Sequence, residues 1–332
     1  MSTKISNLFL FSIISLFCII GIVFYMYKTN KKLNFIAQSC NILKTELTTV
    51  LTNITNHNEN LSCNLNICLP PIAGREEFFK LLPDLNKIKS LEIAPWFNPI
   101  LIGDNVKYFD VYDKKTLIEK AIAEKLDISK IPEISYTHPE GDMSLIKEKF
   151  SLIFSSHNIE HQVDLVKHLN QVANLLEEGG KFFIAIPDKR YCFDHHISIT
   201  PLSEVLAIYW QKPKVHSLQT ILSMRCETTH NDSTEHWKGN NGEMSYKSNV
   251  YFNPYNGDKN FEDVKSCFFD ALKEFEDANG AYIDSHKWRF TPESFYNIVN
   301  ELYKMKLQPL KIEKVFCTAE NSNEFYVILY KP

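Results

Sequence analysis

The sequence predicts an α/β protein with a doubly wound, mostly parallel sheet, preceded by one membrane-spanning helix. From Ser90 onward, short apolar runs alternate with helical stretches, which is typical of parallel strands covered by helices on both faces. The segment Leu8–Tyr27 contains no charged residue. Polar residues gather where the predicted strands end, and sheets of this kind bind ligands beyond the carboxyl ends of their strands.

The composition is that of a globular chain rather than a disordered or fibrous one. Of the 332 residues, 44% are hydrophobic and 23% are charged, which is enough apolar material for a sizeable core. The formal net charge of −4 gives no broad basic surface, so we expect no nucleic-acid partner. The eight cysteines show no paired CxxC spacing and are expected as reduced thiols, although Cys63 and Cys68 would form a local disulfide in an oxidising compartment.

The N-terminal region is predicted to be a short tail (1–7) and a membrane anchor (8–27). At about 1.5 Å rise per residue, this apolar segment crosses a hydrocarbon core of about 30 Å. No small-residue cleavage site follows it, which favours an uncleaved anchor over a signal peptide. Lys28, Lys31 and Lys32 favour a single-pass protein with a cytosolic main domain. The opposite orientation would suit three glycosylation sequons, at Asn53, Asn60 and Asn231.

Residues 28–71 are expected to form a stalk. Apolar residues from Leu33 to Ile54 recur at alternating steps of three and four. This spacing predicts either a short coiled coil, which would make the chain a homo-oligomer, or a single amphipathic helix on the following domain. A polar, hinge-like segment comes next, and we expect the globular domain over residues 72–332.

Four apolar runs predict the centre of the sheet: Ser90–Ala94, Val106–Val111, Phe150–Ser156 and Lys181–Asp188. A helix over Val163–Leu176 precedes the fourth run and ends at a Gly-Gly pair. Near the C-terminus, a Thr-Pro helix start at Thr291 is followed by two alternating strands, Leu310–Thr318 and Asn323–Lys331, which predict a closing hairpin.

An insertion rich in His, Trp, Tyr and Asn separates these two parts. It covers residues 190–287 and follows directly after a strand end. We expect it to cap the carboxyl edge of the sheet and to determine substrate choice, since variable loops on a fixed scaffold carry specificity.

Asp110 is the strongest cofactor clue in the spacing. It ends the second strand, about eighteen residues after Glu92, where a carboxylate accepts both hydroxyls of a ribose; a turn-capping aspartate is the structural alternative. The first strand leads into "SLEIAPWFNP", which has Ala94 and Trp96 in place of turn glycines. A cofactor without a pyrophosphate needs only backbone donors and one tight turn. A positive φ at Ala94 would make the loop strained.

The motifs "LEIAPWFNP", "VKYFDVYD", "HPEGDMS", "FSLIFSSHNIEH" and "LLEEGGKFFIAIPDKRYCFDHH" follow one another along the chain. From about Ser90 to the C-terminus, the chain resembles the class I S-adenosylmethionine-dependent methyltransferases. It is most similar to a subgroup associated with glycan and surface-polysaccharide genes, which also has segments like residues 229–242 and 282–295. Ala94 departs from the family's usual glycine, whereas an aromatic residue such as Trp96 occurs in the subgroup.

The resemblance implies a seven-stranded, Rossmann-like sheet, S-adenosylmethionine as cofactor, and O-methylation of a sugar or glycolipid-type acceptor. A glycan or lipid-linked molecule would then be the partner. The resemblance further implies that Glu92 steadies the first loop, that Asp110 binds the ribose and that Asp142 lies by the adenine. The residues expected at the cofactor are Glu92, Ala94, Trp96, Asn98, Pro99, Asp110, Gly141, Asp142, Ser155, Ser156 and His157.

Methyl transfer to a hydroxyl needs a base that takes the proton, and histidine is the natural choice. The candidate catalytic residues are His157, His230, His236, His286 and Asp188. If the insertion folds over the sheet, its three histidines should approach the pocket that contains Asp110. The alternative for His157 and the nearby His161 is packing and capping of the turn after the third strand.

Substrate contacts are expected from polar and aromatic residues after the fourth strand and in the insertion. They are Arg190, Tyr191, Asp194, His195, Trp237 and Trp288. Surface ion pairs and packing of the cap are the structural alternatives. No metal ion is expected, because the histidines of the insertion show no short spacing of a known zinc type.

Two other classes of function fit the same features. A non-catalytic binding protein with the S-adenosylmethionine fold is suggested by Ala94 and Trp96. A membrane-anchored glycosyltransferase also combines a span, a stalk and an α/β domain, but the chain lacks the Asp-x-Asp pair of the metal-dependent kind.

Overall fold

The structure, a computed structural model, describes residues 67–247, 250–251, 259–260 and 266–332. The chain divides into two compact units, Met1–Ser62 and Cys63–Pro332, and all described residues belong to the second. The predicted anchor (8–27), the Leu33–Ile54 seam and nearly all of the stalk lie outside the described residues. Within the described part, no helix has the length and apolar character needed to cross a membrane.

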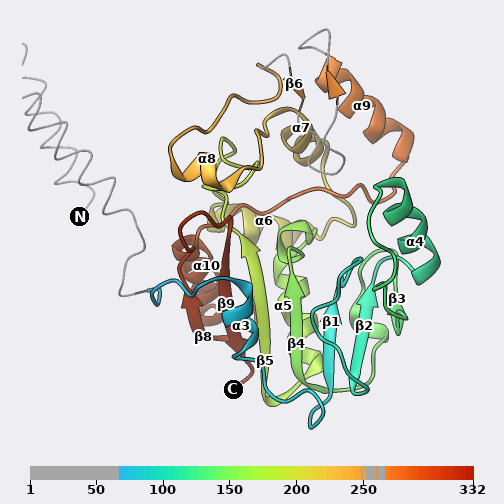
Figure 1. Cartoon of the computed structure of the whole chain (residues 1–332), viewed down its shortest axis with the longest axis vertical. Helices are drawn as coiled ribbons and strands as arrows, with labels where there is room; N and C mark the ends of the chain where they lie inside the picture. The colour runs from blue at the N-terminus through green and yellow to red at the C-terminus, as the bar shows by residue number, and fades with distance from the viewer. Residues whose placement is uncertain (1–66, 248–249, 252–258, 261–265) are drawn as a thin grey trace, which may run out of the picture. The chain divides into compact units, whose positions relative to one another are not determined.

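The centre of the described fold is a seven-stranded sheet in the order β3-β2-β1-β4-β5-β9-β8 (Figure 1). Its strands are β1 (Ser90–Ile93), β2 (Val106–Asp110), β3 (Tyr136–Thr137), β4 (Phe150–Ser156), β5 (Leu176–Pro187), β8 (Lys311–Phe316) and β9 (Glu324–Tyr330). The first five run parallel, and β9 is antiparallel to both of its neighbours. The predicted mostly parallel sheet and its closing hairpin are therefore confirmed.

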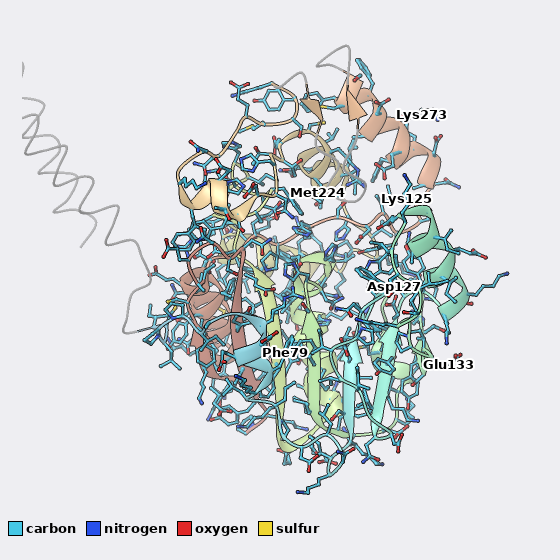
Figure 2. All side chains as sticks on the ribbon, viewed as in Figure 1. Phe79, Lys125, Asp127, Glu133, Met224 and Lys273 are labelled. Carbon is cyan, nitrogen blue, oxygen red and sulfur yellow. The ribbon has the colours of Figure 1, made fainter. Side chains whose placement is uncertain are left out.

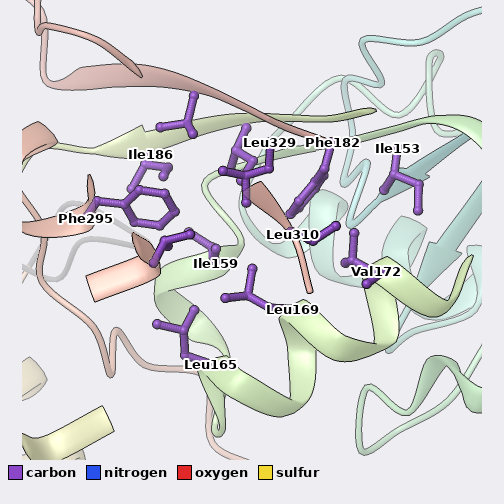
Figure 3. Close-up of a cluster of buried hydrophobic side chains, with 14 of the residues drawn as sticks. Ile153, Ile159, Leu165, Leu169, Val172, Phe182, Ile186, Phe295, Leu310 and Leu329 are labelled. Atoms are coloured by element: carbon purple, nitrogen blue, oxygen red, sulfur yellow. The ribbon is translucent and has the colours of Figure 1, made fainter. Parts of the chain in front are cut away.

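Helices cover both faces of the sheet because its strands are apolar on both sides. Along β5, Phe182 and Ile184 belong to the larger buried cluster, whereas Phe183 and Ala185 belong to a second cluster on the other face. The larger cluster packs against α5 (Leu165–Leu175) and α10 (Pro292–Lys304), and Figure 3 shows the α5 leucines below Phe182 and Ile186. The second cluster includes Phe78 of α3 (Arg75–Phe79), and α4 (Lys114–Ala123) flanks β2 and β3.

The insertion lies beyond the carboxyl ends of the parallel strands, as Figure 1 shows. Its elements are α6 (Leu202–Gln211), α7 (Leu218–Cys226), α8 (Ser233–Trp237), β6 (Val250–Tyr251), β7 (Lys259–Asn260) and α9 (Ser266–Ala278). Figure 2 shows Met224 of α7 and Lys273 of α9 in this upper layer. An ion pair of 2.9 Å between Arg225 and Glu274 links α7 to α9. Cys226 and Cys267, with the partly buried Tyr246, form a small cluster of the cap. The place of the cap over the strand ends brings it to the edge where ligands bind.

The start of the domain and the cysteines differ from expectation in detail. Leu69 pairs with Phe316 of β8, so the chain joins the sheet slightly before the predicted boundary at Ile72. Cys68 is a buried free thiol, which contradicts a Cys63–Cys68 disulfide. The free thiols of Cys192, Cys226 and Cys267 agree with the expected reduced state. Cys317, in contrast, is disulfide-bonded, so the expectation of reduced thiols is wrong at that position.

Candidate active site

A pocket of about 1160 Å³ opens at the carboxyl ends of the central parallel strands. Its walls come from the ends of β1, β2 and β4, the segment before the 3-10 helix Met143–Leu145, the first turns of α5, and the cap. Small-molecule sites commonly measure about 300–1,000 Å³. The pocket therefore has room for a cofactor and part of an acceptor together.

The loop after β1 passes twice through the left-handed conformation, with φ of 55° at Ala94 and 52° at Trp96. The Ala94 N–H donates to the Phe109 carbonyl at 2.8 Å, which holds the turn against β2, and both left-handed residues line the pocket. A non-glycine residue in this region costs about 1–2 kcal/mol, and such strain is concentrated at functional sites. The loop thus has the shape of a glycine turn, although the chain uses alanine and tryptophan there.

Glu92 stabilises this loop from inside the protein. Its side chain is buried, and its Oε2 accepts the N–H groups of Ile100 at 3.0 Å and Leu101 at 2.7 Å. Burial raises the pKa of Glu92 to about 7, against the opposing effect of these two hydrogen bonds. Glu92, Asn98, Pro99 and Ser155 do not line the pocket, so they shape it without reaching a ligand within it.

Asp110 ends β2 and faces into the pocket. Its Oδ1 accepts the Tyr112 N–H at 3.0 Å, and burial raises its pKa to about 6. Gly141 follows from the next segment with φ of 66°, and a Cβ there would meet Val111 at 3.8 Å. Asp142 caps the 3-10 helix by accepting the Ser144 N–H at 2.9 Å. The structure therefore brings Asp110, Gly141 and Asp142 together, as the sequence led us to expect.

His157 follows β4 with φ of 47°, and its backbone N–H donates to the Ala185 carbonyl at 3.0 Å. Its side chain lines the pocket next to Ser156, is 32% exposed, and places Nε2 2.9 Å from Glu324 Oε2. Arg75 holds the same carboxylate through two hydrogen bonds of 2.6 and 2.7 Å. Burial raises the pKa of Glu324, but the bonds from His157 and Arg75 outweigh it and lower the pKa to about 2. His157 is thus oriented by an ionised carboxylate.

Sequence reasoning missed Asp284 and Tyr282, and considered His161 as a candidate base with packing of the turn as the alternative. The His161 Nδ1 lies 2.8 Å from Asp284 Oδ1, the Tyr282 hydroxyl donates to that oxygen at 3.0 Å, and all three residues line the pocket. Burial lowers the pKa of His161, but Asp284 has the larger combined effect and raises it to about 9. No local pattern joins residues 123 positions apart, so only the fold reveals this pair.

His230 and His236 do not line the pocket, so their expected approach to Asp110 is not found. Their rings stack at 4.2 Å, and His236 also stacks on His195 at 5.2 Å. His236 bonds the His230 carbonyl and the Asn241 side chain, both at 3.0 Å. They therefore hold a loop of the cap together. His286 is buried with its ring 4.6 Å from that of His161, one layer behind the pocket wall.

The predicted substrate contacts and Asp188 also lie outside the pocket wall. Asp188 is fully buried, with Arg190 Nη2 at 2.6 Å and the Thr318 hydroxyl donating at 2.6 Å. Tyr191 stacks on Trp237 at 4.0 Å. The residues predicted to touch substrate instead bond or stack on one another, on other cap residues or on neighbouring loops; they are Arg190, Tyr191, Asp194, His195, Trp237 and Trp288.

Other cap residues form the outer wall of the pocket. They are Tyr209, Lys212, Lys214, Arg225 and Glu274, together with residues 282–284. The cap therefore meets the pocket, partly through residues 282–284 of the segment 282–295 noted in the sequence. The other wall residues are charged and aromatic side chains that could not be distinguished from ordinary surface positions in the sequence.

No protein-family profile and no curated protein matches the chain. Among solved structures, it is similar to an S-adenosylmethionine-dependent methyltransferase from Mesorhizobium loti, at 12% identity over 77% of this chain and 96% of that one, with a TM-score of 0.34. The CcbJ methyltransferase from Streptomyces caelestis gives 11% identity, coverage of 77% and 93%, and a TM-score of 0.36.

A Thermotoga maritima S-adenosylmethionine-dependent methyltransferase is also similar, at 20% identity and a TM-score of 0.26. The match covers 35% of this chain and half the length of the Thermotoga protein.

Proposed function

We propose that the chain is an S-adenosylmethionine-dependent methyltransferase that methylates a hydroxyl group of a sugar or glycolipid-type acceptor. The observation that carries the proposal is the convergence of Asp110, the left-handed turn at Ala94 and Trp96, and Asp142 in one large pocket. This pocket lies at the carboxyl ends of parallel strands, where open α/β sheets bind their ligands.

The pocket residues fit an adenosine cofactor of this kind. A carboxylate at the end of β2 suits the two hydroxyls of a ribose, and Asp110 occupies that position. The loop after β1 has no glycine-rich phosphate cradle, which agrees with a cofactor that carries no pyrophosphate. When bound, S-adenosylmethionine supplies an activated methyl group on its sulfonium.

His157 is the base that we propose, because it is the one predicted catalytic residue that lines the pocket. Donation of its Nε2–H to Glu324 leaves Nδ1 unprotonated and able to accept the proton of an acceptor hydroxyl. The ionised Glu324 also stabilises the imidazolium that forms. Arg75, in turn, fixes Glu324 in place through its bidentate contact.

The wall of the cap supports a polar acceptor. Tyr209 offers an aromatic ring, while Lys212, Lys214 and the Arg225–Glu274 pair offer donors and acceptors suited to a polyhydroxyl molecule. A lipid-linked glycan at the membrane, a cytosolic domain and a homo-oligomer through Leu33–Ile54 are further parts of the proposal. The disulfide at Cys317 is a feature of oxidising compartments, and protease protection of the domain in sealed vesicles would refute its cytosolic placement.

The test is methyl transfer by the full chain in vesicles, with radiolabelled S-adenosylmethionine and lipid-linked glycans from the source cells. We expect His157→Ala to lower kcat by about 10²- to 10⁴-fold while S-adenosylhomocysteine affinity stays unchanged. The matched control is His196→Ala, which removes a histidine that bonds a cap carbonyl outside the pocket.

Two results would decide against this function. Cofactor binding without transfer to any glycan fraction would support the non-catalytic binding protein. Incorporation of sugar from a nucleotide-sugar donor, with no methyl transfer, would support the glycosyltransferase.

A further inference from the structure

A buried carboxylate next to the pocket lacks hydrogen-bond partners. Glu160 lies in the 3-10 helix Ile159–His161, its side chain is fully buried, and neither of its carboxylate oxygens accepts a hydrogen bond. The nearest nitrogens to Glu160 Oε1 are Nε2 of His161 at 3.7 Å, Nε2 of His286 at 3.8 Å and Nδ1 of the proposed base His157 at 3.8 Å, all beyond hydrogen-bond distance. A buried charge without close partners is costly, so this arrangement calls for a further group between the three side chains.

The two histidines are held from behind by carboxylates. His161 Nδ1 lies 2.8 Å from Asp284, and His286 Nδ1 lies 2.5 Å from Asp194. With Nδ1–H directed to its carboxylate, each imidazole turns Nε2 towards Glu160, where a metal ion would replace any proton that Nε2 carries. This carboxylate–histidine arrangement is the usual second shell of a metal-binding imidazole. Within residues 67–247 and 266–332, no lysine or arginine nitrogen lies within 4.0 Å of Glu160 to take the place of a cation.

We propose that Glu160, His161 and His286 bind one divalent transition-metal ion beside the active-site pocket. Their ligand atoms all lie within 4.8 Å of one another. Metal–ligand bonds of about 2.0–2.2 Å in a tetrahedral site place neighbouring ligand atoms about 3.3–3.5 Å apart. The two separations from Glu160, 3.7 and 3.8 Å, need a small contraction, and the two histidine nitrogens, within 4.8 Å of each other, need a larger one. Two imidazoles and one carboxylate are a donor set that suits zinc and ferrous iron.

The fold explains why this site has no recognisable pattern in the sequence. Glu160 and His161 are adjacent, but His286 is 126 residues from Glu160 and comes from the far end of the insertion. The Glu160 carbonyl accepts the N–H groups of Lys287 at 2.8 Å and Trp288 at 3.1 Å, which brings the His286 backbone alongside. The expectation of no metal rested on short ligand spacing, which a site assembled across such a distance does not show.

Three protein ligands leave a coordination position open, and His161 lies in the pocket wall. In the methyl transfer proposed above, on which this role rests, the acceptor hydroxyl would bind at that position, where the metal lowers its pKa. The hydroxyl proton passes to His157 and the oxygen forms the new bond to the methyl group. The cofactor leaves as the neutral thioether, so no oxidant or reductant is needed. Metal binding itself displaces any proton held on His161 Nε2.

The test measures metal binding by the full chain in detergent, after removal of bound metal with a chelator. The metal-free chain is dialysed against Zn²⁺, and the metal content is measured by mass spectrometry; Co²⁺ is added separately to record its visible absorption. We expect one ion per chain. Glu160→Gln and His286→Ala should weaken Zn²⁺ binding at least about 100-fold, and Asp194→Asn by about 10- to 100-fold. His236→Ala, which removes a buried histidine elsewhere in the cap, should retain one ion.

Wild-type chain that retains no Zn²⁺ or Co²⁺ would overturn the proposal without reference to any variant. The wild-type chain would bind no metal if protonated His161 and His286, or a bound water, satisfied the Glu160 carboxylate instead. Equal loss of metal in His236→Ala and Glu160→Gln would also contradict it. Circular dichroism checks the fold of each variant. If a ligand variant does not fold, Asp194→Asn, which changes only the partner of His286 Nδ1, serves in its place.

Titration of S-adenosylhomocysteine into the metal-free chain separates the two proposals. Cofactor binding without metal binding refutes the metal site and leaves the methyltransferase in place. Metal binding without cofactor binding supports the metal site and refutes the methyltransferase.

Discussion

Protonation of Asp110 should weaken cofactor binding in mildly acidic solution. Burial raises the pKa of this carboxyl to about 6; Asp284 also raises it, whereas the backbone N–H of Tyr112 and the Lys120 ammonium lower it. Ribose hydroxyls donate to the ionised form, so affinity should rise as pH increases through about 6. About nine-tenths of the sites are ionised at pH 7 and about one-tenth at pH 5, which predicts about tenfold weaker binding at pH 5, or about 1.4 kcal/mol.

Isothermal titration of S-adenosylhomocysteine between pH 5 and pH 8 measures this effect directly. Asp110→Asn should bind weakly and lose the pH dependence, and Asp110→Ala should lower affinity at least tenfold at pH 7. Glu92→Gln is the control, because Glu92 also titrates near neutral pH but does not line the pocket. An affinity that is constant from pH 5 to pH 8 in the wild type, or a pH dependence that survives in Asp110→Asn, would refute the assignment of Asp110 to the ribose.

Three more changes test separate parts of the site. Ala94→Gly removes a left-handed cost of about 1–2 kcal/mol but adds about 0.4–1 kcal/mol of unfolded-state entropy, so urea unfolding should show a small gain in stability; a clear loss would contradict the strain. Arg75→Ala should lower kcat and leave S-adenosylhomocysteine affinity unchanged, since Arg75 acts only through Glu324 and His157; unchanged kcat would exclude this relay. His236→Ala should lower stability by about 1–3 kcal/mol through its lost bonds and leave turnover intact, and a fall in kcat would return His236 to the active site.

The sheet was predictable because its strands carry their own signal. Leu152–Phe154 in β4 and Phe182–Ile186 in β5 are continuous apolar runs, as the centres of strands buried on both faces must be. β3 was missed, since two residues are too few to form a pattern. β5 begins at Leu176, earlier than predicted. Leu176 pairs with Phe150 of β4, and the register shifts before Lys181 pairs with Leu152, so the Gly-Gly pair lies inside the strand.

The cofactor half of the pocket was predictable for a related reason. The carboxyl ends of parallel strands meet at one edge, so residues that end different strands, such as Asp110 and His157, come together whatever the loops do. No comparable rule predicts which residues of the cap come together. Its histidines were chosen as candidates for their chemistry alone. In the structure, His230 and His236 bond loop carbonyls, whereas Asp284 and Arg225 line the pocket.

The most direct test of the account is a structure of the full chain bound to S-adenosylhomocysteine. We predict adenosine in the pocket at the carboxyl ends of β1, β2 and β4, with both ribose hydroxyls within hydrogen-bond distance of Asp110 and the sulfur directed towards His157. A ligand bound elsewhere on the chain, or in this pocket with its ribose away from Asp110, would contradict the account.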